Sequence, residues 1–551
     1  MKKPLTILLL AGNFFLSPGV AAQTTTTEQQ LEALSESDEN QLENDQYLQE
    51  LRYFRLHPIN INTASAEDLQ TFKFLSELQV QHLLRYREAF GKFLSLYELQ
   101  AVPQWDLVTL RRIAPFITIS DDINLKGFKD RFRKGEHSLL LRETRVLETQ
   151  KGYSGSVANG YLGSPDHVLF RYRYQYKNEL RYGITGDKDA GERFGKGAQP
   201  GGFDFYSFHL FAGRLGSIKA LALGDFTVNM GQGLIQWQSL AFKKGGDATA
   251  IKRQGAFLQP YSSAGEYNFN RGAGITFQRK RVEASIFASY KGLNANRTGD
   301  TLRQDEDISG FLTSGYNRTA SEIADKQSVK QTSFGGNLRY HYKTLQIGMN
   351  AAQYWFSLPL QLKEESYNKY EVTGKQWAAY SLDYSYTYRN LHLFGELAQD
   401  QKGSQALVSG LIGSLDPKVD VALLYRRIDA SYRSLYGNAF TENTLPENEN
   451  GCYLGLTIRP DPFWKIDVYG DFFRFPWLKY RVDAPSYGHD YLFQATYQPS
   501  RQFEMYVRYK TEKKSLNGSP DSTTHPVLQI PRQNWRLHFA CALSSQVTLK
   551  A

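Results

Sequence analysis

Residues 377–389 read WAAYSLDYSYTYR, and every second residue from Tyr380 to Tyr388 is Tyr or Leu. The residues between them are Ser, Asp, Ser and Thr. Because successive side chains of a strand point to opposite faces, this period of two predicts a β-strand with one apolar and one polar face. A helix would scatter the same side chains around its axis.

The same period recurs along most of the chain after residue 137. It is clearest at 167–178, 464–472 and 535–543. Tight connections punctuate this region at 178–180, 214–217, 279–282, 342–345, 388–391, 415–419, 459–463, 498–502 and 543–546. Longer polar connections lie between several of them, at 292–330, 357–374, 430–449 and 514–531. Short turns on one side and long loops on the other are typical of outer-membrane barrels, whose short turns are periplasmic.

The predicted fold class is therefore mainly β: a large antiparallel transmembrane β-barrel of about 18–20 or more strands over residues 137–551, preceded by a small all-α domain. The composition agrees, because aromatic residues make up 14% of a chain whose mean hydropathy is only −0.49. The sequence ends on Lys550 and Ala551 just after a turn, without the terminal aromatic residue common in bacterial barrels. We therefore expect the barrel to be C-terminally incomplete.

The N-terminal part contains two further segments before the all-α domain. Lys2 and Lys3, an apolar stretch and small residues at 20–22 predict a signal peptide over residues 1–22. Residues 23–56 are rich in Glu and Asp and predict an acidic spacer that is flexible or loosely helical. No run of eighteen apolar residues follows, so a membrane location must come from strands.

Residues 57–119 predict a compact module of four short helices. Asn62 can cap the first helix, and Ser76 with Gln79 makes a capping box for the second. Gly91 can end that helix, and Asp106 can cap the last one. Short helices with tight connections need a shared core, so we expect an independent α domain.

The stretches ININTASAEDLQ, LLRYREAFGKFLSLYELQAVP and LRRIAPFITI of this module resemble a paired helix-hairpin-helix domain of the competence DNA-receptor type. In that family a Gly-hydrophobic-Gly turn places backbone N–H groups on a DNA phosphate. This chain has Phe74-Leu75-Ser76 and Gln104-Trp105-Asp106 at the two turns. The resemblance thus implies a DNA-binding scaffold whose phosphate-binding glycines have been lost.

The candidate nucleic-acid or partner contacts are the turn residues and the basic residues of the module. They are Lys73, Phe74, Ser76, Arg85, Arg87, Lys92, Gln104, Trp105, Arg111 and Arg112. The formal net charge of +9 suits nucleic acid, anionic lipid or anionic solutes and does not choose among them.

The stretches GDFTVNMGQGLIQWQSLAF (224–242) and LQPYSSAGEYNFNRGAG (258–274) carry a second resemblance. Together with the module, they resemble a family of Bacteroidota outer-membrane barrels with an N-terminal helix-hairpin-helix domain. The first stretch lacks the Gly-Lys-Ser/Thr ending of a nucleotide-binding loop. Gly224, Gly231 and Gly233 are instead candidates for a sharp bend or for a plug inside the barrel.

Basic residues on the polar faces of the strands are candidates for the lumen wall. They are Arg171, Arg173, Lys177, Arg339, His341, Lys343 and Arg536. Asp383 and Asp467 share those faces, so we expect mixed charge. Neither a His/Cys metal spacing nor a Gly-x-Ser-x-Gly motif occurs in the sequence. We therefore predict no catalytic residue, no metal, no cofactor and no enzymatic activity.

Two functional hypotheses remain. In the first, the barrel is a non-enzymatic outer-membrane protein in contact with lipid, and its periplasmic module docks an envelope protein. In the second, the barrel is a transport channel for DNA or another anionic polymer or solute, and the module is the periplasmic receptor.

Overall fold

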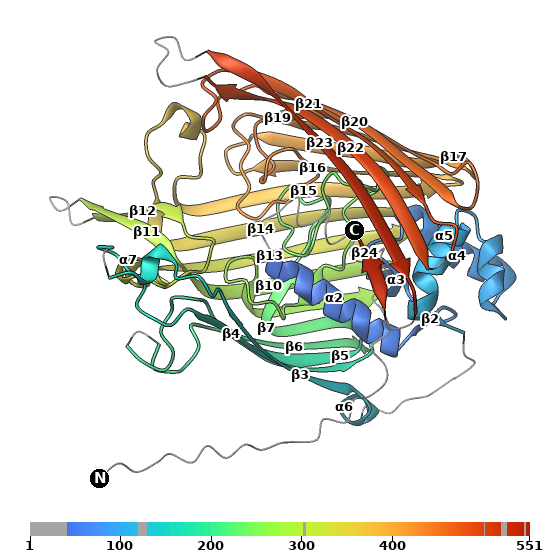
Figure 1. Ribbon diagram of the computed structural model, residues 1–551, viewed down its shortest axis with the longest axis horizontal. Helices are drawn as coiled ribbons and strands as arrows, with labels where there is room; N and C mark the ends of the chain where they lie inside the picture. Colours follow the sequence, from blue (N-terminus) through green and yellow to red (C-terminus); the bar gives the residue numbers. More distant parts are fainter. Residues whose placement is uncertain are drawn as a thin grey trace.

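The computed structural model describes residues 41–119, 129–155, 157–197, 199–300, 305–500, 502–518, 526–544 and 547–551. These residues form a large antiparallel β-barrel and a small helical module at one of its ends (Figure 1). The predicted signal peptide at 1–22 and the first part of the predicted spacer lie outside the described residues.

The barrel wall consists, in the described residues, of eighteen strands of nine or more residues. They are β3 (Glu136–Arg145), β4 (Asp166–Tyr176), β5 (Leu180–Lys188), β6 (Phe205–Leu215), β7 (Ile218–Val228), β9 (Asn270–Arg279), β10 (Val282–Leu293), β13 (Val329–Tyr342), β14 (Leu345–Leu360), β15 (Gly374–Tyr388), β16 (Leu391–Asp400), β17 (Gln405–Asp416), β18 (Val419–Ile428), β19 (Glu449–Ile458), β20 (Trp464–Phe475), β21 (Ser486–Tyr497), β22 (Phe503–Asn517) and β23 (Val527–Ala542). Four shorter strands belong to the same sheet: β8 (Leu258–Pro260), β11 (Ala295–Asp300), β12 (Asp305–Phe311) and β24 (Thr548–Lys550).

Neighbouring wall strands pair antiparallel in chain order. The pairs β7–β9 and β10–β13 carry the wall past the short β8 and past the β11–β12 hairpin. The order closes into a barrel through β24, which pairs with the end of β23. The predicted mainly β fold is therefore confirmed.

The predicted short turns are all found between consecutive strands. Several are two-residue hairpins, in which a Lys or Arg adopts a positive φ, as the twist of paired strands requires. These residues are Lys280, Lys343 and Arg389. Lys177 has a positive φ in the three-residue connection 177–179, and Arg214 has one inside β6. One predicted loop is more ordered than expected, because the region 292–330 contains the β11–β12 hairpin and helix α7 (Ala320–Asp325).

The two faces of the wall differ as the sequence pattern predicts. On β15, Tyr380 and Leu382 are exposed, whereas Ser381 and Asp383 are buried. Polar inward-facing side chains of a wide barrel become buried only when its lumen is filled. The alternation between exposed and buried side chains therefore indicates both an apolar outer face and a packed interior.

The helical module begins earlier in the chain than predicted. Helix α2 (Gln41–Leu56) occupies the second part of the segment that we expected to be a spacer. Its Tyr47, Leu51 and Phe54 are buried in the module core. Their spacing of four and three residues puts them on one helix face, so this segment belongs to the domain.

The rest of the module contains α3 (Ala66–Gln70), α4 (Glu77–Phe90), η1 (Leu96–Ala101), α5 (Leu107–Ile113), η2 (Ala114–Phe116) and the parallel pair β1 (Ile59–Asn60) and β2 (Ile117–Thr118). The Ser76–Gln79 capping box and the Asp106 cap form as predicted. The first cap differs: it is Ser65 rather than Asn62. Short elements complete the chain at α6 (Asp130–Arg133), η3 (Lys151–Tyr153) and η4 (Ser366–Asn368). Among the described helices, none has both the length and the apolar character needed to cross a membrane.

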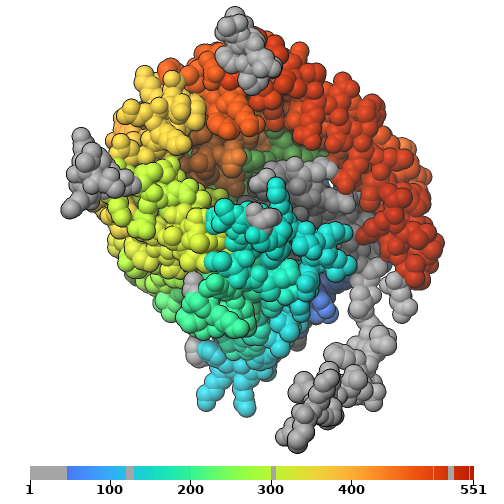
Figure 2. All heavy atoms as spheres, turned by 60° about the vertical axis from the view of Figure 1, so that its left-hand side comes forward, coloured from blue at the N-terminus to red at the C-terminus, as the bar shows by residue number. Residues whose placement is uncertain are grey.

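Two long connections turn into the barrel. They are residues 229–257, between β7 and β8, and residues 429–448, between β18 and β19; we call them the first and second internal segments. Apolar side chains of both, such as Leu234 and Tyr432, share one core with inward-facing wall residues such as Phe394. A parallel bridge joins Gln236 to Tyr436, which ties the two segments together. Figure 2, which views the barrel from the side where the long loops lie, shows the ring of strands around this interior.

Candidate functional site

The glycine-rich stretch forms a turn of the first internal segment around a wall carboxylate. Gly231 and Gly233 have φ values of 52° and 84°. The backbone N–H groups of Gln232 and Leu234 donate to Glu396 Oε2 at 2.6 and 3.0 Å. A Cβ on Gly231 would lie 2.5 to 2.7 Å from that carboxylate, so any other residue would displace the Glu396 side chain from these two N–H groups. These contacts favour the predicted plug.

Gly224 has a different setting from the other two candidate glycines. It lies within β7, has a φ of 83°, and a Cβ there would come 2.3 Å from the Phe208 carbonyl oxygen. Gly224 pairs with Gly272 of β9, and the register there has no shift, so its positive φ and this close approach require a glycine while the predicted bend stays a prediction.

Lys244 anchors the first internal segment in an acidic part of the wall. Its ammonium pairs with Glu442 of the second internal segment, and lies 2.9 Å from Asp471 and 3.2 Å from Asp490. Arg426 also binds Asp471, through two nitrogens at 2.8 and 2.9 Å. Arg426, Asp471 and Asp490 are buried, and the side chains of Lys244 and Glu442 are each 9% exposed. An ion pair so poorly exposed that loses one partner leaves an uncompensated charge.

Arg253 holds the two internal segments to each other. Its guanidinium donates to the carbonyl oxygens of Asn438 and Ala439, at 2.7 and 2.9 Å, and to that of Phe242. The segments therefore form one packed unit rather than two independent loops.

The helical module sits at the short-turn end of the barrel, where the blue helices lie at the right of Figure 1. His82 Nε2 lies 3.0 Å from the carbonyl oxygen of Arg389, in the β15–β16 turn. Arg85 donates to the Thr387 carbonyl at 2.8 Å. Tyr53 accepts the backbone N–H of Lys177, in the β4–β5 turn, at 2.8 Å. The module thus contacts turns on separate parts of the ring.

The contact is complementary in charge. Acidic residues of the module pair with basic residues of the barrel or of the first internal segment. The pairs are Glu50–Arg181, Glu67–Lys219, Asp68–Arg214, Glu77–Lys252 and Asp106–Arg459. We call this set the acidic seat. Sequence reasoning followed the basic residues of the module and missed its acidic ones, because pairing between an acidic residue of the module and a basic residue far along the chain leaves no local pattern in the sequence.

Glu77 is the most deeply buried acid of the seat. Burial alone would raise the pKa of its carboxyl, but the Lys252 ammonium 3.4 Å away and hydrogen bonds from Gln81 and Gln70 lower that pKa to about 2. The charged form of Glu77 is therefore favoured by the seated arrangement.

The two turns that would bind phosphate in a DNA-binding relative face the barrel. Phe74, Ser76, Gln104 and Asp106 line a cavity between the module and the first internal segment. Asp106 accepts the Thr109 N–H at 2.6 Å as a helix cap and pairs with Arg459. The predicted interpretation of Asp106 as a cap is confirmed, and its carboxylate meets a basic residue of the barrel.

Trp105, Gln104 and Phe74 of these two turns also make contacts within the module. Trp105 is buried, and its indole N–H donates to the Gln79 carbonyl at 3.0 Å. The Gln79 side chain in turn donates to the Gln104 carbonyl at 3.0 Å. The Phe74 ring packs against Phe72 and Phe116.

Most of the basic candidate residues of the module are engaged. Lys73 donates to the Gln254 carbonyl at 2.6 Å, and burial lowers the pKa of its ammonium to about 8. Arg87 binds carbonyl groups within the module, Arg111 reaches the Gln498 carbonyl, and Arg112 lines the cavity. Of the six basic candidates, Lys92 alone is exposed.

The lumen candidates divide into strand residues and turn residues. Arg171 is buried on β4, and Arg173 donates to Gln49 of α2 at 3.0 Å. Arg339, His341 and Arg536 lie on strands at half-buried positions. Lys177 and Lys343 were predicted wrongly as lumen residues: both occupy positive-φ positions in hairpin turns at the barrel end.

The comparisons with known proteins support the module. A family model described as helix-hairpin-helix motif matches residues 56–118, which supports the predicted helix-hairpin-helix character of the module. A search of curated proteins finds no match to the sequence. The resemblance to competence receptors and to a Bacteroidota family stays a prediction.

The chain is also similar to solved structures, among them the outer membrane protein OprD and OccK3 (OpdO), both from Pseudomonas aeruginosa. OprD is 9% identical, with 72% of this chain and 92% of that chain covered and a TM-score of 0.34. OccK3 (OpdO) is 10% identical, with 78% and 100% covered and a TM-score of 0.36. Because these TM-scores are low, the evidence for the barrel is the strand pairing of this structure itself.

Proposed function

We propose that this protein is a non-enzymatic outer-membrane barrel that forms a closed passage, with the helix-hairpin-helix module as its periplasmic gate. The outward face carries exposed aromatic and aliphatic residues, as lipid contact requires. Short turns of such barrels are periplasmic, and the module sits at that end.

The acidic seat is the observation that carries this proposal. Five ion pairs join the module to the mouth of the barrel or to the first internal segment. In four of the five pairs, all except Glu77–Lys252, one side chain keeps more than a fifth of its surface exposed, and such ion pairs can be exchanged without unfolding either partner. The seat therefore suits a part that is released and reseated, whereas a permanent lid would be held by an apolar core.

A second candidate function, docking of an envelope protein, is favoured by the free side of the module. Phe90, Leu94 and Tyr97 are 76%, 84% and 82% exposed, and they lie close together in the chain. Clustered large apolar side chains on a water-facing surface mark protein contacts. A partner at this surface would contact the module without covering the residues of its seat.

The third interpretation, DNA uptake, requires a further step. The two turns that resemble DNA-binding turns face the barrel, so duplex DNA could reach them only after the module had left its seat. We therefore keep transport of DNA, or of another anionic cargo, as the alternative to the closed passage.

Single-channel recording in planar bilayers tests the closed passage. We expect full-length protein to be nearly silent and Lys244→Met to conduct, because Glu442, Asp471 and Asp490 would then repel one another and displace the internal segments. Lys375→Met, at an exposed position of β15, is the matched control and should stay silent. Wild-type protein that conducts as freely as Lys244→Met would overturn the proposal.

Photocrosslinking in whole cells tests the docking surface. A crosslinking residue at position 97 should give one discrete protein adduct, and Leu94→Asp should abolish it. If the adduct is absent, or persists unchanged with Leu94→Asp, the exposed side of the module is not the docking surface.

A further inference from the structure

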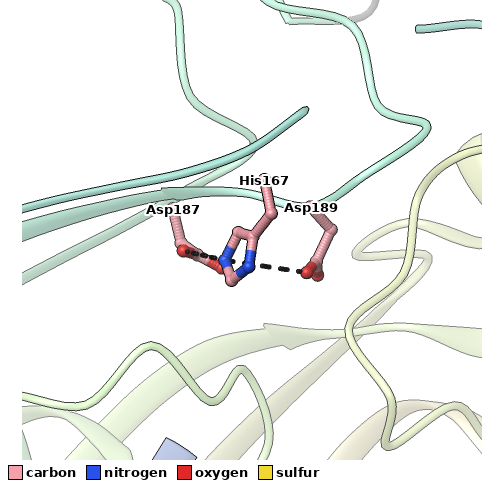
Figure 3. Close-up of side chains that lie close together, drawn as sticks. All are labelled: His167, Asp187 and Asp189. Atoms are coloured by element: carbon pink, nitrogen blue, oxygen red, sulfur yellow. Dashed lines mark hydrogen bonds and ion pairs between the residues drawn. The ribbon is translucent and has the colours of Figure 1, made fainter. Parts of the chain in front are cut away.

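A histidine and two aspartates meet at the long-loop end of the barrel, away from the acidic seat (Figure 3). His167 is the second residue of β4, Asp187 lies near the end of β5, and Asp189 follows that strand. The register pairs Val168 with Lys188, so the next pair outward is His167 with Asp189. Asp187 is two residues from Asp189 and shares its face.

We infer that His167, Asp187 and Asp189 form a binding site for a divalent transition-metal ion, of the class of Zn²⁺. The His167 Nε2 atom lies 3.0 Å from Asp187 Oδ1 and 4.0 Å from Asp189 Oδ1. The three ligand atoms all lie within 4.8 Å of one another. Figure 3 shows the imidazole between the two carboxylates.

These separations are close to what a metal needs. Ligand atoms about 2.1 Å from a tetrahedral Zn²⁺ are about 3.4 Å apart. The His167–Asp187 pair is slightly closer than that and the His167–Asp189 pair slightly wider. Asp189 is the ligand that has to move, and it follows the last residue of β5, where the backbone is free of the sheet.

The charges around the three residues favour a cation. Within the described residues, the Asp189 carboxylate accepts no hydrogen bond, and its one ion-pair contact is His167. The nearest ammonium, that of Lys188, points elsewhere: it donates to the carbonyl oxygens of Asp166 and Asp189, at 2.5 and 3.1 Å. Two carboxylates thus share a single imidazole, and a divalent ion would balance them.

The ligand set also selects the kind of metal. Ca²⁺ and Mg²⁺ prefer oxygen ligands alone, whereas an imidazole suits Zn²⁺ and its neighbours among the transition metals. The Asp187 side chain is buried, while His167 and Asp189 each keep about a quarter of their side-chain surface exposed. Three protein ligands with one open side leave room for water to complete the coordination.

A metal here would hold an external loop to the wall. The backbone N–H of Asp189 donates to Glu192 Oε2 at 2.9 Å. The other oxygen of Glu192 accepts the N–H of Asn317, in the connection before α7, at 2.8 Å. Fixing Asp189 would therefore also stabilise the contact between two neighbouring long loops.

The test uses the full-length protein in detergent after treatment with a chelator and buffer exchange. Titration with ZnCl₂, followed by calorimetry and by elemental analysis, should give about one Zn²⁺ per chain that His167→Ala and Asp189→Asn each weaken more than about tenfold. Co²⁺ should give a visible absorption band in the wild type and not in His167→Ala.

His489→Ala is the matched control, because His489 lies near the same end of the barrel on β21 and should leave Zn²⁺ binding unchanged. Circular dichroism confirms that each variant keeps its strands; if His167→Ala does not, Asp189→Asn, outside the strand, decides. Wild-type protein without stoichiometric Zn²⁺, or a His167→Ala variant that binds like His489→Ala, would overturn the inference.

Discussion

Gly231 helps to hold the first internal segment inside the barrel because it has no side chain. The turn it forms lets two backbone N–H groups reach Glu396, and this contact attaches the first internal segment to β16. We expect Gly231→Ala to lower the temperature of thermal unfolding and to raise single-channel conductance, because the new Cβ collides with the carboxylate.

Gly216→Asn is the control for this substitution. Gly216 also has a positive φ, of 65°, but a Cβ there meets nothing within 4 Å. Asn tolerates this backbone region, so conductance should stay at the wild-type level. Equal effects of the two substitutions would show that the internal segment does not depend on the Glu396 contact.

The lowered pKa of Glu77 predicts that the attachment of the module to the barrel weakens in acid. Because the pKa of Glu77 is lowered from 4.5 to about 2 when the module is seated, its ionised form contributes stability above pH 4.5 that is lost as the pH falls from 4.5 towards 2. We expect proteolytic cleavage of the module to accelerate over that pH range.

Glu77→Gln should flatten this acid response, since the variant has no carboxyl to protonate at that position. Glu88→Gln, on an exposed part of α4, should keep the wild-type profile. A cleavage profile that is identical in wild type and Glu77→Gln would remove Glu77 from the account.

At the scale of elements, the predictable parts were those with a local pattern. The period of two gave the wall strands, and tight polar dipeptides such as Arg389-Asn390 gave the turns. The turn at 178–180 fixes the register of β4 and β5. The meeting of His167 with Asp187 and Asp189 was nevertheless missed, because their spacing in the sequence matches no common metal-binding motif. The inward path of residues 429–448 was equally hidden, because a polar loop that packs inside a lumen looks like one that faces water.

Helix α2 was missed because its acidic residues dominate the composition. Its apolar face is narrow: Tyr47, Leu51, Tyr53 and Phe54 are the residues of α2 in the module core, and many polar residues surround them in the sequence. The face was nevertheless present at helical spacing, and periodicity rather than composition would have shown it.

Leu51→Ala tests whether α2 is structural. Leu51 is 3% exposed, and removal of such a side chain typically costs about 2–5 kcal/mol. We expect the module of the full-length variant to be cleaved by protease at lower urea concentrations than in the wild type. Arg52→Ala, on the exposed side of the same helix, should have no such effect; comparable sensitivity of both variants would argue that α2 is not part of the core.

At the scale of the whole molecule, the seat and the DNA-like turns exclude each other. In the closed form Lys73 and Arg85 bind carbonyl groups of the first internal segment and of the barrel. We expect full-length protein to bind a fluorescent duplex weakly, and a variant with Glu67→Gln, Asp68→Asn and Glu77→Gln together to bind it more tightly, as measured by anisotropy at low and moderate salt.

Lys92, which is exposed in the closed form, provides a control for this binding experiment. Lys92→Ala should weaken the residual binding of the wild type, whereas Lys73→Ala should not. If Lys73→Ala weakens binding in the wild type as much as in the seat variant, the turns are accessible in the closed form.

The Lys244 cluster also imposes an order on assembly. Lys244 precedes its partners Glu442, Asp471 and Asp490 by about two hundred residues or more. Contacts of such high sequence separation form late, because a long loop must close before they can contribute. When the first strands have already paired, the first internal segment therefore still lacks the carboxylates that pair with Lys244. Completion of β20 and β21 is then the event that commits the nascent barrel to its shut form.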